Sequence, residues 1–255
     1  MLSVDPEART FEVEIAKSGE AAFKTGEKTV FRVSRGDAEI GYLGRRIQAN
    51  ASFYNKSWHL EQVFPLDGEG AREVRLVNRI LHRETSAMRR GKFLREGDAI
   101  PDFGMIDQHG QFVRASDLRG QAFVLNFIFT RCQAPEMCPA SSTKMEALQE
   151  KSRESGLEQL HFVTISFDPA FDSPGILRSY GRGYGMEFAN YHLLTGTKEV
   201  VEDLLRQFGI LTMEEDGTIN HTIATLLVDA DGVVAYREEG PAWKVENFLK
   251  AAREL

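Results

Sequence analysis

The sequence predicts an α/β protein in which a small all-β unit precedes a larger unit built on a mixed sheet. Short runs of alternating apolar and polar residues occur before residue 77, and strand and helix patterns alternate after residue 98. The charge balance changes at the same place. We therefore divide the chain into a β-unit at 1–77, a basic linker at 78–97 and an α/β unit at 98–255.

The composition is typical of a folded globular protein. Of its 255 residues, 42% are hydrophobic and 27% are charged, which argues against disorder. The longest nearly apolar run, 122–129, is far shorter than the roughly 18 residues of a membrane helix. The first residues lack the basic and apolar regions of a signal peptide. We expect either a cytoplasmic protein or one whose targeting segment or membrane anchor is absent from this chain.

Charge is distributed unevenly along the sequence. Residues 1–97 carry 17 Lys and Arg against 14 Asp and Glu, whereas residues 98–255 carry 14 against 24. Phosphate binding depends on clustered Lys and Arg. The acidic second half therefore argues against a nucleic-acid partner.

The first 77 residues show four strand patterns separated by turn residues. The expected strands are 11–15, 29–33, 40–49 and 58–64. Short strands at roughly ten-residue spacing, with no helical stripe, are typical of a small barrel or sandwich. We expect an OB-like barrel.

The linker at 78–97 is rich in positive charge. Its six basic residues are Arg79, Arg83, Arg89, Arg90, Lys92 and Arg95. We favour a solvated linker with a short helix. The alternative is a basic strip that contacts an acidic partner or a membrane surface.

From residue 98 onward, strands and helices alternate. The expected elements are a hairpin at 102–106 and 111–113, a buried strand at 122–129, a helix from Pro139, a strand at 161–167, a helix at 174–182, a strand at 191–195, a helix at 198–207, a hairpin at 222–228 and 233–236, and a helix at 242–254. This order is the thioredoxin-like arrangement, an α/β sandwich on a mixed sheet.

The two cysteines of the chain, Cys132 and Cys138, lie in one loop between a buried strand and a helix. They allow one disulfide, one redox pair or one two-thiolate metal site, and they exclude a four-cysteine zinc site. Because the start of a helix stabilises a thiolate, we expect Cys138 to have a lowered pKa. Thiolates attack disulfides and bind soft metals.

A histidine far along the chain completes a candidate site. His221 lies at the start of a strand pattern, and in a thioredoxin-like fold that strand lies beside the cysteine loop. Two thiolates and one imidazole suit Cu(I) in a three-coordinate site, or Cu(II) with an additional weak ligand. A structural role for His221 is the alternative.

At this point residues 98–255 resemble the Sco/SenC family of copper-binding, thioredoxin-fold proteins. The matching stretches, in family order, are Pro101-Asp-Phe103, Leu118-Arg-Gly120, Asn126-Phe-Ile-Phe-Thr-Arg-Cys132, Cys138-Pro139, Ile165-Ser-Phe-Asp-Pro169 with Asp172-Ser-Pro174, Leu194-Thr-Gly-Thr197 and His221-Thr222. The resemblance implies copper ligands at Cys132, Cys138 and His221. It also implies an extracytoplasmic, membrane-anchored protein that delivers copper to, or reduces cysteines of, the copper A centre of cytochrome c oxidase. The first half lies outside the resemblance.

The spacing of the cysteines departs from the family pattern. The family usually has three residues between them, whereas Cys132 and Cys138 are separated by five, including Pro135. The longer loop can still fold back, because a disulfide needs Cα atoms only about 5–6 Å apart. Copper affinity and redox potential therefore do not carry over from the family.

Other residues near the motif receive lesser roles. We expect Asp168 either to orient the loop or to cap the helix that begins near Ser173. A carboxylate at Glu136 could raise a thiol pKa. We assign Met137 and Met213 to apolar packing rather than to a distant axial ligand. His109, His161 and His192 are taken as structural residues.

Three functions compete at this stage. The first is a copper metallochaperone, the second is a thiol–disulfide oxidoreductase without obligatory metal, and the third is a binding module whose first unit does the work. Thioredoxin-type oxidoreductases carry a cis-proline beside the dithiol, but no proline occurs here between Pro174 and Pro241. We therefore favour copper binding, with redox activity as a coupled second role.

Overall fold

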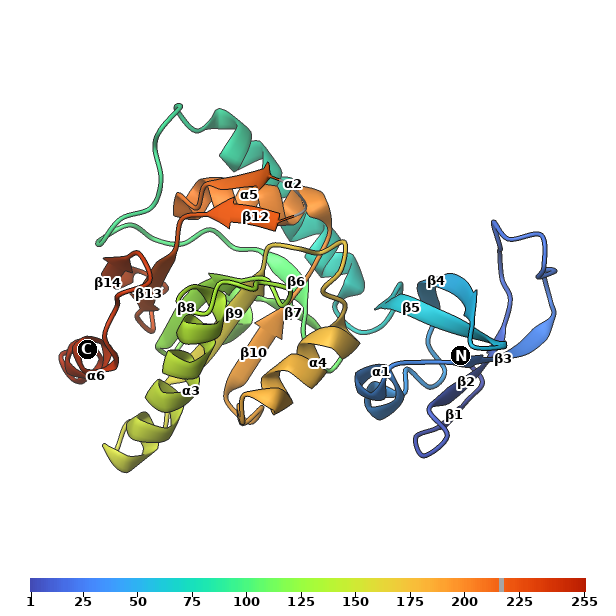
Figure 1. Cartoon of the computed structure of the whole chain (residues 1–255). Coiled ribbons are helices and arrows are strands. Elements are labelled where there is room, and N and C mark those ends of the chain that lie inside the picture. The colour runs from blue at the N-terminus through green and yellow to red at the C-terminus, as the bar shows by residue number, and fades with distance from the viewer. Residues whose placement is uncertain (216–217) are drawn as a thin grey trace.

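The computed structural model describes the backbone of residues 1–215 and 218–255, and the side chains of those residues except 213–221. Figure 1 shows a small N-terminal sheet beside a larger α/β unit. No helix among the described residues is long and apolar enough to cross a membrane.

The N-terminal unit is a five-stranded sheet with one short helix. Its elements are β1 (Ser3–Asp5), β2 (Thr10–Glu14), β3 (Lys28–Arg32), α1 (Arg35–Ile40), β4 (Ile47–Tyr54) and β5 (Ser57–Pro65), and the strand order is β1-β2-β3-β5-β4. The unit is therefore not all-β. Its edge strands β1 and β4 do not pair with each other in the described sheet, so the expected closed barrel is not confirmed.

The helix α1 lies between the strands expected at 29–33 and 40–49, where turn residues were expected, and the second of these strands begins only at Ile47. Ser34 caps the helix, because its hydroxyl accepts a hydrogen bond from the Asp37 backbone N–H at 3.0 Å. Gly41, at φ 80°, ends the helix. The sequence Ser34-x-x-Asp37 is typical of a helix start, but the helix is only six residues long and has no apolar stripe that would indicate it.

The larger unit is built on a central sheet of five strands. The sheet order is β10-β9-β8-β13-β14, from β8 (Phe123–Ile128), β9 (His161–Ser166), β10 (Tyr191–Leu194), β13 (Ala224–Val228) and β14 (Val234–Glu239). Strands β8, β9 and β10 are parallel, whereas β13 runs antiparallel to both β8 and β14. The expected mixed sheet is therefore observed.

Helices cover both faces of this sheet. The remaining elements are β6 (Gly104–Ile106), β7 (Phe112–Arg114), the short 3-10 helix Ala115–Leu118, α3 (Cys138–Glu154), α4 (Pro174–Gly183), α5 (Lys198–Phe208), β11 (Thr212–Glu215), β12 (Thr218–His221) and α6 (Val245–Arg253). Val124 and Phe162 pack with α3, α4 and α6, whereas Leu125 and Val163 face α5. Figure 1 shows these layers on either side of the strands.

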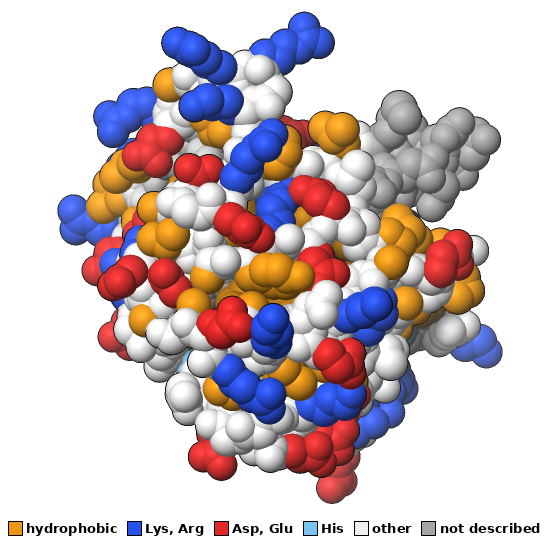
Figure 2. Space-filling view, turned by 90° about the vertical axis from the view of Figure 1, so that its left-hand side faces the viewer, with side chains coloured by type: hydrophobic (Ala, Val, Ile, Leu, Met, Phe, Trp, Pro, Cys, Tyr) orange, Lys and Arg blue, Asp and Glu red, His pale blue; other side chains and the backbone are white. Residues whose placement is uncertain are grey.

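The segment expected to begin a linker is a long helix instead. The helix α2 (Ala71–Ala87) crosses the boundary that we placed at residue 77. Leu81 is fully buried in the core of the larger unit, and the Asn78 side chain exchanges two hydrogen bonds with the Gly104 backbone. The inward side of α2 contains apolar Ala71, Val74 and Leu81, but polar Asn78 and Thr85 interrupt the apolar stripe and charged residues surround it. Figure 2 shows Lys and Arg side chains gathered at the top of the molecule, where α2 ends in Figure 1.

Candidate metal centre

The cysteine loop lies where a fully buried strand passes into a helix. All six residues of β8 are buried, and α3 begins at Cys138 with Pro139 in its first turn. Cys138 is 1% exposed, whereas Cys132 is partly exposed. The strand, loop and helix therefore follow the order expected from the sequence.

The two thiols come together despite the five residues between them. Cys132 lies near enough to Cys138 to raise the pKa of the Cys138 thiol through charge and hydrogen bonding, and both side chains pack against the same apolar cluster. The Cys132 thiol also donates to the Ala134 carbonyl at 3.9 Å. The loop turns back on itself, since Met137 N–H donates to the Ala134 carbonyl at 3.0 Å and Ala140 N–H donates to the Pro135 carbonyl at 3.1 Å. The extra residues form these turns and do not separate the thiols.

The expected lowering of the Cys138 pKa is wrong. Burial raises the pKa of this thiol well above its ordinary value, and the neighbouring Cys132 raises it further. Backbone hydrogen bonds at Phe129 and at Cys138 itself act in the opposite direction but are outweighed. The position at the helix start was correctly identified, but the sequence did not show how completely the thiol is enclosed.

Two aspartates from the loop after β9 hold the beginning of the cysteine loop. Asp168 accepts hydrogen bonds from Arg131 Nε at 3.0 Å and Nη2 at 2.6 Å, directly before Cys132 in the chain. Asp172 accepts from the Thr130 backbone N–H at 3.0 Å and from the Thr130 hydroxyl. The orienting role predicted for Asp168 is thus supported, and Asp172 is a residue that sequence reasoning did not assign.

A buried polar network lies beneath the loop. Asn126 Nδ2 donates to Ser141 Oγ at 3.1 Å, and Thr164 Oγ1 donates to Asn126 Oδ1 at 2.6 Å. Trp243 Nε1 also donates to Ser141 Oγ, at 3.4 Å. These bonds tie the first turn of α3 to the middle of the sheet. The only sequence signal for the network was the polar Asn126 in an otherwise apolar strand.

The backbone places His221 toward the end of the sheet that carries the cysteine loop. His221 pairs with Thr212 in the β11–β12 hairpin, and β13 begins three residues later at Ala224. Since β13 runs antiparallel to β8, the start of β13 lies beside the end of β8, where the loop begins. The side chains of His221 and Met213 lie outside the described residues.

The other methionine, glutamate and histidine residues considered from the sequence do not complete a metal site with the two cysteines among the described side chains. Met137 is partly buried at the start of α3, and Glu136 is exposed. His161 and His192, whose rings stack at 6.5 Å, lie at the starts of β9 and β10, at the end of the sheet opposite the cysteine loop. Burial lowers the pKa of both imidazoles and of His109. Among the side chains that the structure describes, no three His, Cys, Asp or Glu residues form a metal-binding group.

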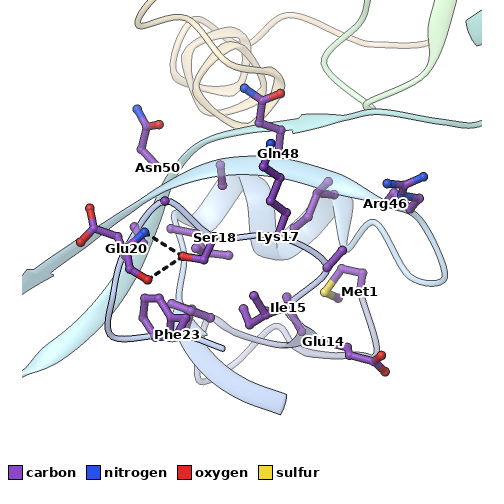
Figure 3. A pocket seen from close by; sticks show the side chains of 18 of the residues that line it. Met1, Glu14, Ile15, Lys17, Ser18, Glu20, Phe23, Arg46, Gln48 and Asn50 are labelled. Carbon is purple, nitrogen blue, oxygen red and sulfur yellow. Dashed lines mark hydrogen bonds between the residues drawn. The ribbon is translucent and has the colours of Figure 1, made fainter. Parts of the chain in front are cut away.

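A cavity of about 720 Å³ lies in the N-terminal unit, away from the cysteine loop. Figure 3 shows apolar Met1, Ile15 and Phe23 in its lining, together with polar side chains such as Glu14 and Arg46. The lining contains no cysteine or histidine, and Met1 supplies its one sulfur atom. Soft metals prefer several sulfur or imidazole ligands, so the lining does not suit a second copper site.

Comparison with known proteins identifies relatives of the larger unit. The family model described as SCO1/SenC matches residues 94–245. The SCO1 protein homolog of Bacillus subtilis is 29% identical over 139 residues, which cover 53% of this chain and 70% of that protein. A Stutzerimonas stutzeri protein, named as a candidate copper-binding protein, is 32% identical over 139 residues, covering 52% and 66% respectively.

Solved structures show the same relationship. A SCO1/SenC family lipoprotein from Bacillus anthracis aligns with a TM-score of 0.58 and 28% identity, covering 64% of this chain and 98% of that one. BsSco, described as having a disulfide switch and as a member of the Sco family of cytochrome c oxidase assembly proteins, aligns with a TM-score of 0.55 and 25% identity, covering 64% and 99%. These matches support the thioredoxin-like fold of the larger unit.

Proposed function

Because the chain belongs to the SCO1/SenC family, we propose that it binds copper as its cargo through Cys132, Cys138 and His221. The observation that carries this proposal is the meeting of the two thiols on one loop at the end of β8. The similar Stutzerimonas stutzeri protein is itself named for copper binding, which supports the choice of metal.

The donor set fits copper. Two sulfur atoms suit soft Cu(I), and an added imidazole nitrogen makes Cu(II) acceptable as well. Binding by both cysteines requires the release of two thiol protons, since the thiolate is the metal ligand. Asp168 and Asp172 hold the backbone before Cys132, so the loop keeps its shape while the thiols exchange protons for metal.

We propose that the chain delivers this copper to the copper A centre of cytochrome c oxidase or to another cuproprotein. Support comes from BsSco, which is described as belonging to a family of cytochrome c oxidase assembly proteins. An extracytoplasmic, membrane-anchored location is part of the same proposal, and the lipoprotein from Bacillus anthracis supports it.

Thiol–disulfide exchange is the second candidate function. The contact between Cys132 and Cys138 favours it, because a neighbouring thiol can close a disulfide without large movement. In that reaction, two thiols lose two protons and two electrons to form the S–S bond, and a disulfide of the partner protein is reduced to two thiols. The BsSco disulfide switch supports this reading.

Copper titration of the reduced full chain tests the first function. We expect one copper per chain, and we expect both Cys132→Ser and Cys138→Ser to lose stoichiometric binding because each removes one of two sulfur donors. His82→Gln is a control for a change outside the proposed site, since this exposed histidine pairs with Asp203 at 3.0 Å. Full binding by both serine variants would place the copper elsewhere.

His221→Ala distinguishes the two functions. Without the imidazole, Cu(I) can still be held by two thiolates, whereas Cu(II) binding falls sharply. The disulfide should still form, because thiol exchange does not need the imidazole. Intact Cu(II) binding together with abolished disulfide turnover would favour the oxidoreductase over the copper carrier.

A further inference from the structure

The outward face of α2 combines positive charge with exposed aliphatic side chains. Ala71, Val74, Leu81 and Thr85 are buried and define the inward side of the helix. The opposite side carries Arg72, Leu76, Arg79, Ile80 and Arg83. Because residues at i, i+4, i+7 and i+11 lie along one stripe of a helix, three arginines alternate there with aliphatic residues.

These arginines have no acidic partner among the side chains that the structure describes. Among the residues that the structure describes, Arg72, Arg79 and Arg83 form no ion pair, and all three are exposed. Glu73, on the flank of α2, lies 3.9 Å from Arg114 instead. The segment after the helix adds Arg89, Arg90 and Lys92, which are also exposed. The face of α2 and the segment after it thus form a positive surface with no ion pair to these three arginines among the described side chains, although residues 98–255 carry an excess of acidic side chains.

The aliphatic residues on this face are also uncovered. Leu76 is 41% exposed and Ile80 is 47% exposed. A solvated helix face is normally polar, whereas a helix that lies on a membrane places aliphatic residues among Lys and Arg. The long arginine side chains then reach the headgroups while the aliphatic side chains enter the interface.

We propose that this outward face of α2, made of Arg72, Leu76, Arg79, Ile80 and Arg83, lies on an anionic lipid surface. Charge complementarity with acidic headgroups accounts for the unpaired arginines. The exposed Leu76 and Ile80 favour a bilayer over an acidic polypeptide, because aliphatic side chains can enter the membrane interface but add nothing to charge pairing. None of the five residues belongs to the proposed copper site, so the inference goes beyond the proposed function.

Vesicle co-sedimentation of the full chain tests the proposal. We expect binding to vesicles of phosphatidylglycerol and phosphatidylcholine, no binding to phosphatidylcholine alone, and weaker binding as salt rises. Replacing Arg72, Arg79 and Arg83 together by Gln should weaken binding on the order of 100-fold, from three lost charges. Gln keeps the helix propensity of these positions.

Two further variants sharpen the test. The control Lys24→Gln, Lys28→Gln and Lys56→Gln makes the same change in net charge on exposed residues of the N-terminal unit, and it should bind vesicles as the wild type does. Leu76→Gln with Ile80→Gln keeps all charges and should still weaken vesicle binding, because it removes the aliphatic contribution. Circular dichroism and copper content verify that each variant remains folded.

Three results would overturn the proposal. One is an absence of wild-type binding to the anionic vesicles at low salt. Another is equal loss of binding in the lysine control and the arginine variant, which would show a response to net charge alone. The third is binding to soluble polyglutamate as tight as to vesicles and unaffected by Leu76→Gln with Ile80→Gln, which would assign the face to an acidic protein.

Discussion

At the scale of single residues, burial raises the pKa of acidic groups that the sequence alone suggests are ionised at neutral pH. Asp37 lies in the first turn of a short helix of the N-terminal unit, yet it is 2% exposed. Its Oδ2 accepts a hydrogen bond from Ser34 Oγ at 2.6 Å, and its Oδ1 has no hydrogen-bond partner among the described residues. Burial therefore raises the pKa of Asp37 from 3.8 to about 6, although the bond from Ser34 lowers it in part.

This raised pKa predicts that Asp37 destabilises the folded protein at neutral pH. Because the folded state holds the proton more tightly than the unfolded state, the favourable contribution is complete below pH 3.8 and is lost as pH rises through about 6. Asp37→Asn should raise the free energy of unfolding by up to about 3 kcal/mol near pH 8, and should change it little near pH 4.

Urea unfolding of both proteins at the two pH values checks this prediction. Asp231→Asn, at an exposed turn, is the matched control and should have no comparable effect. A stability difference between Asp37→Asn and wild type that is the same at both pH values would contradict the assigned cause.

The candidate site shows what could be predicted for single residues. The positions of Cys132 and Cys138 on a strand-to-helix loop followed from local pattern. The orienting role of Asp168 was one of two roles that the sequence left open, and its contact with Arg131 supports that role. The protonation of Cys138 and the contacts of Asp172 did not, because both depend on how segments distant in sequence enclose them. The roles of the two cysteines and of His221 as copper ligands remain predictions.

At the scale of elements, the strands and helices of the larger unit were readable because their apolar patterns are strong. The main errors concern α1, which was expected to be a turn, and α2, which starts earlier and is longer than the short helix expected in the linker. In α2 the inward side includes Thr85 and Asn78, whose hydrogen bonds to Gln207 and Gly104 replace apolar contacts. Periodicity of apolar residues cannot reveal a helix that docks partly through polar bonds.

The packing of α2 predicts where the larger unit can be cut. A fragment that begins at residue 98 loses Leu81, which is fully buried in the core, whereas a fragment that begins at residue 68 keeps the whole helix. We expect the 68–255 fragment to be more stable by at least about 3 kcal/mol, the cost of exposing one large core side chain and its neighbours. Thermal unfolding of the two fragments measures the difference, and equal stability would show that α2 is not part of this unit.

At the scale of the whole molecule, the N-terminal unit contacts the segment that supports the cysteine loop. Gly36 of α1 lies so close to the Gly175 carbonyl of α4 that a side chain at either glycine would overlap its neighbour. Glu39 joins the same contact through Arg178 at 3.0 Å and Arg182 at 3.1 Å. Since α4 begins directly after Asp172 and Ser173, the two units meet beside the anchor of the cysteine loop.

This arrangement assigns separate tasks to separate surfaces. The proposed copper site lies at the end of the sheet between β8 and α3, the proposed lipid contact lies on the outward face of α2, and the N-terminal unit packs against α4. The ligand set of the proposed copper site is the feature that most needs a direct measurement.

X-ray absorption at the copper edge of the loaded full-length protein provides that measurement. The proposed ligand set predicts two sulfur neighbours and one nitrogen neighbour of Cu(I) in the wild type, with the nitrogen lost and both sulfurs kept in His221→Ala. A wild-type spectrum without sulfur neighbours, or a nitrogen contribution that is unchanged in His221→Ala, would contradict it.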